Sequence, residues 1–218
     1  MRKSVRHKIQ CLIALAVFGV SPAALGFAPS AGSAGTGTFW NKQSTKLGFS
    51  LITYSGTETE SFSGKTGFGG EIVTERGHKT FAAFGKVRGE YSSTSATFED
   101  GGADSVLTYQ MMMGEALLGI KVGLFPANRF TPYISGAGVA GLASLTFTSS
   151  SLTTLNKSET ATILGYEVGA GVELEFKREY NQKFLVWGEI QSRKSSGDLA
   201  GKGDFALDGL RMVFGVGW

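Results

Sequence analysis

The residues of this chain that could do acid–base chemistry are mostly glutamates at alternate positions. Glu173 and Glu175 lie in the segment LGYEVGAGVELEF (164 to 176), where they resemble a carboxylate pair for general acid and base work. Glu167 and three glycines share their parity, and the other parity is apolar throughout. Alternate side chains share one face of a β-strand. We therefore interpret the glutamates as neighbours on one face that share Arg and Lys partners.

Two other motifs suggest chemistry less directly. His78 lies in the segment ERGHK (75 to 79), which we expect to be a short turn. The run Met111 to Met113 contains soft ligands, but at period two Met112 faces away from its neighbours, and gap-filling by flexible side chains is the simpler interpretation. Cys11 is the only cysteine. We expect no catalytic residues, no metal site and no cofactor.

The N-terminus has the pattern of a secretory signal peptide. Basic residues in MRKSVRHKIQ precede an apolar run, CLIALAVFGV, and then small residues. The run is too short for a bilayer span of about 20 residues. We place cleavage after Gly26, with Ala28 as a second choice, so the expected organisation is a signal peptide (1–26), a flexible lead-in (27–38) and one β-domain (39–218).

Removing that leader changes the charge balance. It contains four of the 21 Lys and Arg and none of the 18 Asp and Glu, which leaves 17 against 18, a net charge of −1. Cys11 leaves with it. The remaining chain has no basic excess that would indicate a nucleic-acid partner, and no disulfide or cysteine metal site is possible in it.

Alternation and turn residues predict eight strands in the remaining chain. Glycine is 32 of 218 residues and is dispersed among the apolar residues, as in strands and turns. The predicted strands cover residues 45–54, 66–75, 80–97, 105–124, 131–148, 160–176, 184–194 and 204–218. Short connections (75–79, 125–129, 177–183) alternate with longer polar ones (55–65, 98–105, 149–159, 194–203). This pattern predicts an all-β, eight-stranded antiparallel up-and-down transmembrane β-barrel.

The polar face of these strands combines charge with glycine. Such a small barrel is just wide enough for side chains to fill it, so long charged side chains on the inner face need small neighbours. Six cations nearly balance seven anions, as an enclosed interior requires. The predicted interior charges are Lys46, Glu71, Lys86, Arg88, Glu90, Glu115, Lys121, Glu167, Glu173, Glu175, Glu189, Arg193 and Arg211. Leu, Val and Phe would then face lipid.

Aromatic residues on the predicted lipid face gather near the short turns. Such a grouping is typical of an interfacial girdle. The girdle residues are Phe81, Tyr133, Phe176, Phe184 and Trp218.

These features together resemble the small eight-stranded outer-membrane barrels, the family of OmpX-like proteins and the OmpA membrane domain. The resemblance covers about residues 39 to 218 and rests on the signal peptide, RFTPYISGAGVAG (129 to 141), LGYEVGAGVELEF and the terminal FGVGW. It implies that Phe214, Val216 and Trp218 form a C-terminal signal for the barrel assembly machinery, and that the tight turns and both termini face the periplasm. Expected partners are outer-membrane lipid and lipopolysaccharide. We expect a monomer without a peptidoglycan-binding domain.

Function is less constrained than fold. A charged, plugged interior favours an envelope-structural or surface-interaction role through the longer loops. A narrow ion or small-solute pore is the alternative. Some barrels of this kind modify lipid A through a histidine and a hydroxyl near the outer rim, but His78 would lie at the opposite end, so an enzyme is a remote alternative.

Overall fold

The computed structural model describes most of the chain after its N-terminal region. The described residues are 43–55, 66–100, 103–125, 129–149, 157–177, 183–198 and 204–218. The predicted signal peptide (1–26), lead-in (27–38) and much of the longer loops lie outside these ranges, so those assignments stay predictions. Within the described ranges no helix is long and apolar enough to cross a membrane.

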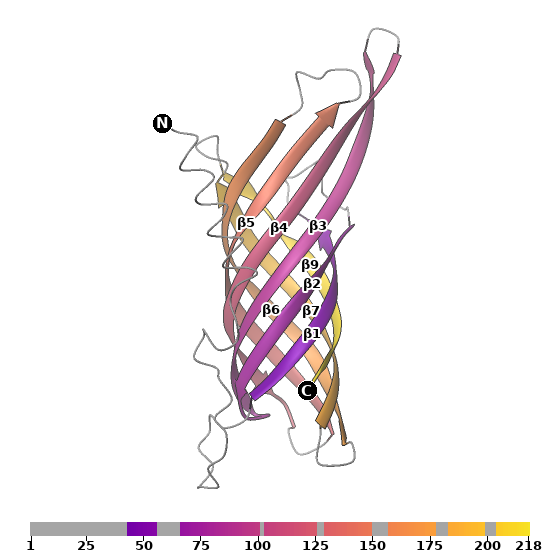
Figure 1. Ribbon diagram of the computed structural model, residues 1–218. Helices are drawn as coiled ribbons and strands as arrows, with labels where there is room; N and C mark the ends of the chain where they lie inside the picture. Colours follow the sequence, from indigo (N-terminus) through magenta and orange to yellow (C-terminus); the bar gives the residue numbers. More distant parts are fainter. Residues whose placement is uncertain are drawn as a thin grey trace. The chain divides into compact units, whose positions relative to one another are not determined.

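All described elements are antiparallel strands of one sheet. They are β1 (Gln43–Tyr54), β2 (Thr66–Gly77), β3 (Phe81–Asp100), β4 (Ala103–Gly123), β5 (Phe130–Ser149), β6 (Lys157–Lys177), β7 (Lys183–Asp198), β8 (Asp204–Ala206) and β9 (Gly209–Gly217). Each strand from β1 to β7 pairs with the next, and β9 pairs with both β7 and β1. The sheet therefore closes on itself (Figure 1).

The last predicted strand is divided in the structure into β8 and β9. The register does not change across the break, because Ser196 lies opposite Ala206 and Arg193 opposite Gly209. At the break, the Asp208 carboxylate accepts a hydrogen bond from the Ser195 backbone N–H at 3.2 Å. Since β8 extends the ladder of β9 along β7, the barrel has eight strands around its circumference, and the predicted eight-stranded up-and-down fold is confirmed.

The two ends of the barrel differ. We call the end with Gly77 and Phe81 the turn end, and the end with Tyr54 and Thr66 the loop end. At the turn end, His78 and Phe81 exchange backbone hydrogen bonds of 2.7 and 3.0 Å. Gly77 has a φ of 146°, and a Cβ atom there would lie 2.5 Å from the Phe81 carbonyl oxygen. Only glycine fits this tight turn without strain.

The strands at the loop end are longer than predicted. Residues 98–105 were expected to form a loop, but β3 continues to Asp100 and β4 begins at Ala103. Asp100 and Ala103 are paired, so the connection is short. The Glu, Asp, Gly and Ser residues of this segment favoured a loop in the sequence, whereas hairpin pairing with the partner strand continues the ladder. As a result β3 to β6 have 20 or 21 residues and β1 and β2 have 12.

Alternate residues of each strand point into and out of the barrel. In the run of three methionines, Met111 is 1% exposed and Met113 5%, whereas Met112 is 63% exposed. The predicted division of this run between two faces is therefore confirmed. In the middle of the barrel most inward side chains are charged or small, with Phe84 and Trp187 among them, and the outward ones are apolar, the reverse of a water-soluble β-protein.

Candidate functional site

The interior of the barrel holds a large buried set of charged side chains. Twelve of the thirteen predicted interior charges are buried, and the other, Glu175, is intermediate. Those twelve are Lys46, Glu71, Lys86, Arg88, Glu90, Glu115, Lys121, Glu167, Glu173, Glu189, Arg193 and Arg211. The structure brings eleven of them together in two groups at different depths, while Glu189 is bound by two hydroxyl groups, so the interior is a layered network.

The central cluster contains four cations and four anions. Its members are Lys86, Arg88, Arg193, Arg211, Glu71, Glu90, Glu115 and Glu167. The Arg88 guanidinium lies 2.6 Å from both Glu115 and Glu167, and Arg193 lies 2.5 Å from Glu115. Arg211 binds Glu167 at 2.6 Å and also contacts Glu90. Formal charge is balanced within the cluster.

A buried amide completes the central cluster. The Gln191 side-chain oxygen accepts hydrogen bonds from Arg88 at 3.5 Å and Arg211 at 3.3 Å. The cluster thus draws on β2, β3, β4, β6, β7 and β9 and crosses the lumen. Such pairing is required because each unpaired buried charge costs several kcal/mol.

The mouth cluster lies nearer the turn end and consists of Lys46, Lys121, Glu75 and Glu173. Lys46 binds Glu75 at 2.6 Å and also Glu173, while Lys121 binds Glu75 at 2.5 Å and Glu173 at 2.6 Å. Two cations and two anions therefore form a closed ring. The Lys46 ammonium also lies 5.6 Å from the Trp187 ring centroid, and that of Lys121 lies 5.2 Å from the Tyr133 ring, within the range of cation–π attraction.

Glu75 is an essential member that the sequence analysis missed. It was expected at the junction of the strand 66–75 and the turn 75–79, but β2 continues to Gly77 and Glu75 pairs with Phe84 of β3. Its parity is that of Glu71 and Val73, both of which face inward. Extending that alternation by one more step would have identified it.

Glu175 does not lie within the interior network, where it was expected. Its carboxylate binds the Lys79 ammonium at 2.6 Å, and both side chains are partly exposed. Lys79 belongs to the turn between β2 and β3, so this pair lies at the rim. The alternation correctly predicted the face, but the depth depends on strand ends that the alternation does not define.

Tyr133 was expected in the lipid-facing girdle, and the structure corrects this. It is 3% exposed, and its hydroxyl donates a hydrogen bond to Glu189 at 3.2 Å. Ser135 also donates to Glu189. A Cβ atom on Gly171 would lie 2.6 Å from the Tyr133 ring, so the glycine makes room for it. Glu189 differs from the other interior carboxylates because, among the described residues, its hydrogen-bond donors are these two hydroxyls.

An apolar plug fills the interior toward the loop end. It consists of Ile52, Tyr54, Met111, Met113, Ala143, Leu145, Ala161, Ile163 and Leu207. The rings of Tyr109 and Phe147 pack against it, with centroids 5.4 Å apart at 84°. The alternating charges in the sequence predicted a charged interior and did not indicate this layer, although the inward parity of residues 109–113 and 143–147 is apolar.

A cavity of about 370 Å³ opens at the turn end. His78, Lys79 and Glu175 line its rim, and it reaches Lys121 and Glu173 of the mouth cluster. The predicted turn position of His78 is therefore confirmed. Across the described ranges, no group of three or more His, Cys, Asp or Glu side chains is arranged to hold a metal ion.

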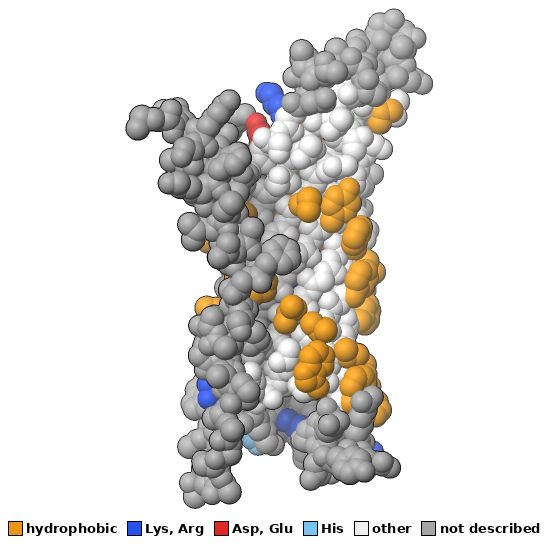
Figure 2. Space-filling model, viewed as in Figure 1, with side chains coloured by type: hydrophobic (Ala, Val, Ile, Leu, Met, Phe, Trp, Pro, Cys, Tyr) orange, Lys and Arg blue, Asp and Glu red, His pale blue; other side chains and the backbone are white. Residues whose placement is uncertain are grey.

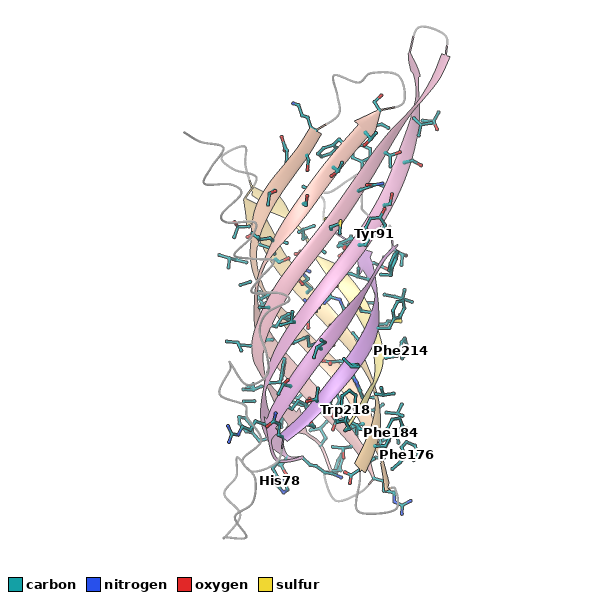
Figure 3. The ribbon with its side chains drawn as sticks, in the orientation of Figure 1. His78, Tyr91, Phe176, Phe184, Phe214 and Trp218 are labelled. Atoms are coloured by element: carbon teal, nitrogen blue, oxygen red, sulfur yellow. The ribbon has the colours of Figure 1, made fainter. Side chains whose placement is uncertain are left out.

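The outer wall is apolar (Figure 2). Its exposed side chains include Leu118, Ile120, Leu164, Ile190 and Phe214. Phe176, Phe184 and Trp218 lie near the same end as His78 (Figure 3), and the rings of Phe176 and Phe184 are 6.4 Å apart. Phe130 is exposed on β5 close to the position expected for Tyr133, while Phe81 begins β3 at this end. Phe214, Val216 and Trp218 all point outward.

Known proteins that are similar to this chain were found among solved structures. No protein-family model matches the chain, and no curated protein matches it. It is similar to Ail, the attachment invasion locus protein of Yersinia pestis, solved with the heparin analogue sucrose octasulfate (13% identity, TM-score 0.47, 81% of this chain and 97% of that chain). Neisserial surface protein A (10%, 0.45, 80% and 94%) and a major outer membrane protein from Thermus thermophilus (10%, 0.45, 81% and 98%) are also similar. These likenesses concern the fold alone.

The central cluster predicts a large effect of neutralising Glu115. Glu115→Gln should lower the free energy of unfolding by about 3 to 5 kcal/mol, because Arg88 and Arg193 remain buried without that partner. Glu175→Gln, at the partly exposed rim, should change it by less than about 1 kcal/mol. Urea unfolding in lipid vesicles, followed by tryptophan fluorescence, measures both. Equal losses in the two variants would contradict the assignment of Glu115 to a sealed layer.

Proposed function

We propose that this chain, which has the fold of the small eight-stranded barrels, is a bacterial outer-membrane protein exported by a cleaved signal peptide. The observation that carries the proposal is the reversed sidedness of the wall, with apolar side chains outward and paired charges inward. Such a wall exposes far more apolar surface than a soluble protein tolerates. A hydrocarbon environment around the barrel accounts for this exposed apolar surface.

The height of the apolar wall supports a membrane location. On β6, apolar outward residues extend from Phe176 to Leu164, twelve residues apart. At about 3.3 Å per residue this is about 40 Å along the strand. With the roughly 35–45° tilt of strands in such barrels, the height is about 30 Å, close to the ~25 Å apolar band typical of outer-membrane proteins.

The end aromatic residues support an orientation. Phe176, Phe184 and Trp218 gather at the turn end, as in an interfacial girdle, and in this orientation the short turns and the chain's C-terminus face the periplasm. We include in the proposal that Phe214, Val216 and Trp218 serve as the assembly signal, that lipid and lipopolysaccharide surround the monomer, and that the loops serve an envelope-structural or surface-interaction role.

The layered interior supports a closed barrel. A solute crossing the lumen would have to disrupt the central cluster and then the apolar plug, both of which are buried. The charged layer is held by ion pairs of 2.5 to 2.6 Å, and the apolar layer consists of buried side chains packed together. These two successive barriers of different chemistry favour a barrel closed to solutes, with a structural or surface-interaction role, over a pore.

A narrow pore remains the second candidate, because the cavity at the turn end gives access to the mouth cluster. An enzymatic role has no comparable support, since His78 lies in the turn at the periplasmic end in this orientation.

Cell fractionation tests the location. Antibody detection should find the protein in outer-membrane fractions, and the unboiled protein should migrate faster on a denaturing gel than the boiled protein, because a closed barrel stays compact in detergent. Recovery as a dissolved periplasmic protein without such a shift would contradict the proposal.

Planar bilayers test the plug separately. The purified protein should give no steady ion conductance, because both barriers are intact. Arg88→Ala should also stay closed, since the apolar plug is unaffected. A steady conductance of the parent protein that Arg88→Ala or Lys121→Ala abolishes would favour the pore.

A further inference from the structure

The wall of the barrel changes its sidedness toward the loop end. On β3 to β6 the outward apolar residues end at Tyr91, Met112, Leu142 and Leu164. Beyond them, the outward residues whose side chains the structure describes carry hydroxyl or amide groups, apart from Val106, and Glu99 and Asp104 continue the outward parity at the ends of β3 and β4. We call the set with hydroxyl or amide groups the hydroxyl face. It consists of Ser93, Ser95, Thr97, Thr108, Gln110, Ser144, Thr146, Thr148, Ser158, Thr160 and Thr162.

The inner side reverses at the same depth. Behind the hydroxyl face lie Met111, Leu145 and Ile163 of the apolar plug, whereas behind the apolar wall lies the charged central cluster. On β4 to β6 the wall thus changes from apolar outside and charged inside to polar outside and apolar inside, whereas on β3 the inward residues at this depth, Ser92 and Thr94, are polar. Because the polarity of the outward and inward side chains changes at one depth, we expect the medium outside the barrel to change there.

The boundary is level even though the strands are tilted. Met112, the last outward apolar residue of β4, pairs with Ser144 of β5, and Ser144 pairs with Thr160 of β6. If the boundary followed the strand pairing, the last outward apolar residue of β6 would therefore be at position 160. The boundary occurs instead between Thr162 and Leu164. In Figure 1 the strands from β3 to β6 lean in one direction, and a horizontal line across them must shift along each strand relative to the pairing. The observed shift has this sense, as a planar membrane surface requires.

The chemistry of the hydroxyl face selects among neighbours beyond that plane. None of its residues is Lys, Arg, Asp or Glu, so it lacks the cations that bind phosphate. Hydroxyl groups both donate and accept hydrogen bonds, as the hydroxyls of sugars do. The face is also continuous with the lipid-facing wall, so whatever covers it must adjoin the acyl chains.

We infer that the plane between Leu164 and Thr162 is the outer edge of the hydrocarbon layer, and that the hydroxyl face beyond it contacts the sugar residues of the surrounding glycolipid, lipopolysaccharide. This rests on the proposed outer-membrane function and deepens it. The longer strands, β3 to β6, would be held in the saccharide layer by side-chain hydrogen bonds. The apolar plug would fill the barrel interior at the same depth.

Single cysteines placed four residues apart on β6 test the inference. Leu164→Cys and Thr160→Cys are made separately in the full chain carrying Cys11→Ser, and both positions are exposed and point outward. Each protein is placed in vesicles of phosphatidylcholine, of phosphatidylcholine with lipid A, or of phosphatidylcholine with core-containing lipopolysaccharide. Labelling by a water-soluble maleimide is then measured.

The expected pattern has three parts. Leu164→Cys is protected in all vesicles, Thr160→Cys is labelled with phosphatidylcholine and with lipid A, and its labelling is lost with core-containing lipopolysaccharide. Adding Thr146→Val and Thr148→Val to Thr160→Cys should restore labelling, because the β-branched shape is kept and the hydroxyls are lost.

Each other outcome identifies a different failure. Labelling of Leu164→Cys in phosphatidylcholine would overturn the proposed membrane location itself. Protection of Thr160→Cys in phosphatidylcholine would show that the boundary is misplaced. Persistent labelling with lipopolysaccharide would show that the face meets only water, and protection unchanged by the valine substitutions would show crowding without hydrogen bonding.

Discussion

The need to pair every charge that closure places inside determines much of this structure. An eight-stranded barrel has little free interior space, so its Lys, Arg and Glu side chains meet across the lumen. Arg88 on β3 reaches Glu115 on β4 and Glu167 on β6, and Arg211 on β9 reaches the same Glu167. The two pairs to Glu167 join strands that are distant in sequence. They therefore favour one register of the closed sheet over others, in addition to neutralising buried charge.

Around that constraint the interior is divided into layers of different chemistry. From the turn end there follow an open cavity, the mouth cluster, a ring that includes Phe84, Trp187 and Val213, the central cluster and the apolar plug. The aromatic residues separate the two charged clusters and contact their lysines, with Lys86 lying 5.6 Å from the Phe84 ring centroid. Access differs between the two ends, because the cavity reaches the mouth cluster and the plug seals the central one.

The sequence predicted the sidedness well because period two leaves little ambiguity where charge, glycine and apolar residues alternate, as in residues 164–176. It failed where that contrast is weak. In β5 both faces mix apolar and small residues and neither carries a charge, so Tyr133 was placed on the wrong face. Glu75 was missed because a polar segment obscures where a strand ends. The apolar plug was missed because an apolar inward face is visible only after the strands' full length and register are known.

The central claim is that the inside and outside of this barrel are reversed relative to a soluble protein, and two tryptophans report it most directly. Trp187 is 3% exposed inside the barrel and Trp218 is 59% exposed outside. Variants that retain one of them, with the other two of the three tryptophans replaced by Phe, can be placed in vesicles containing brominated phospholipid. Strong quenching of Trp218 fluorescence and weak quenching of Trp187 are predicted. Strong quenching of Trp187 with Trp218 unaffected would contradict the account.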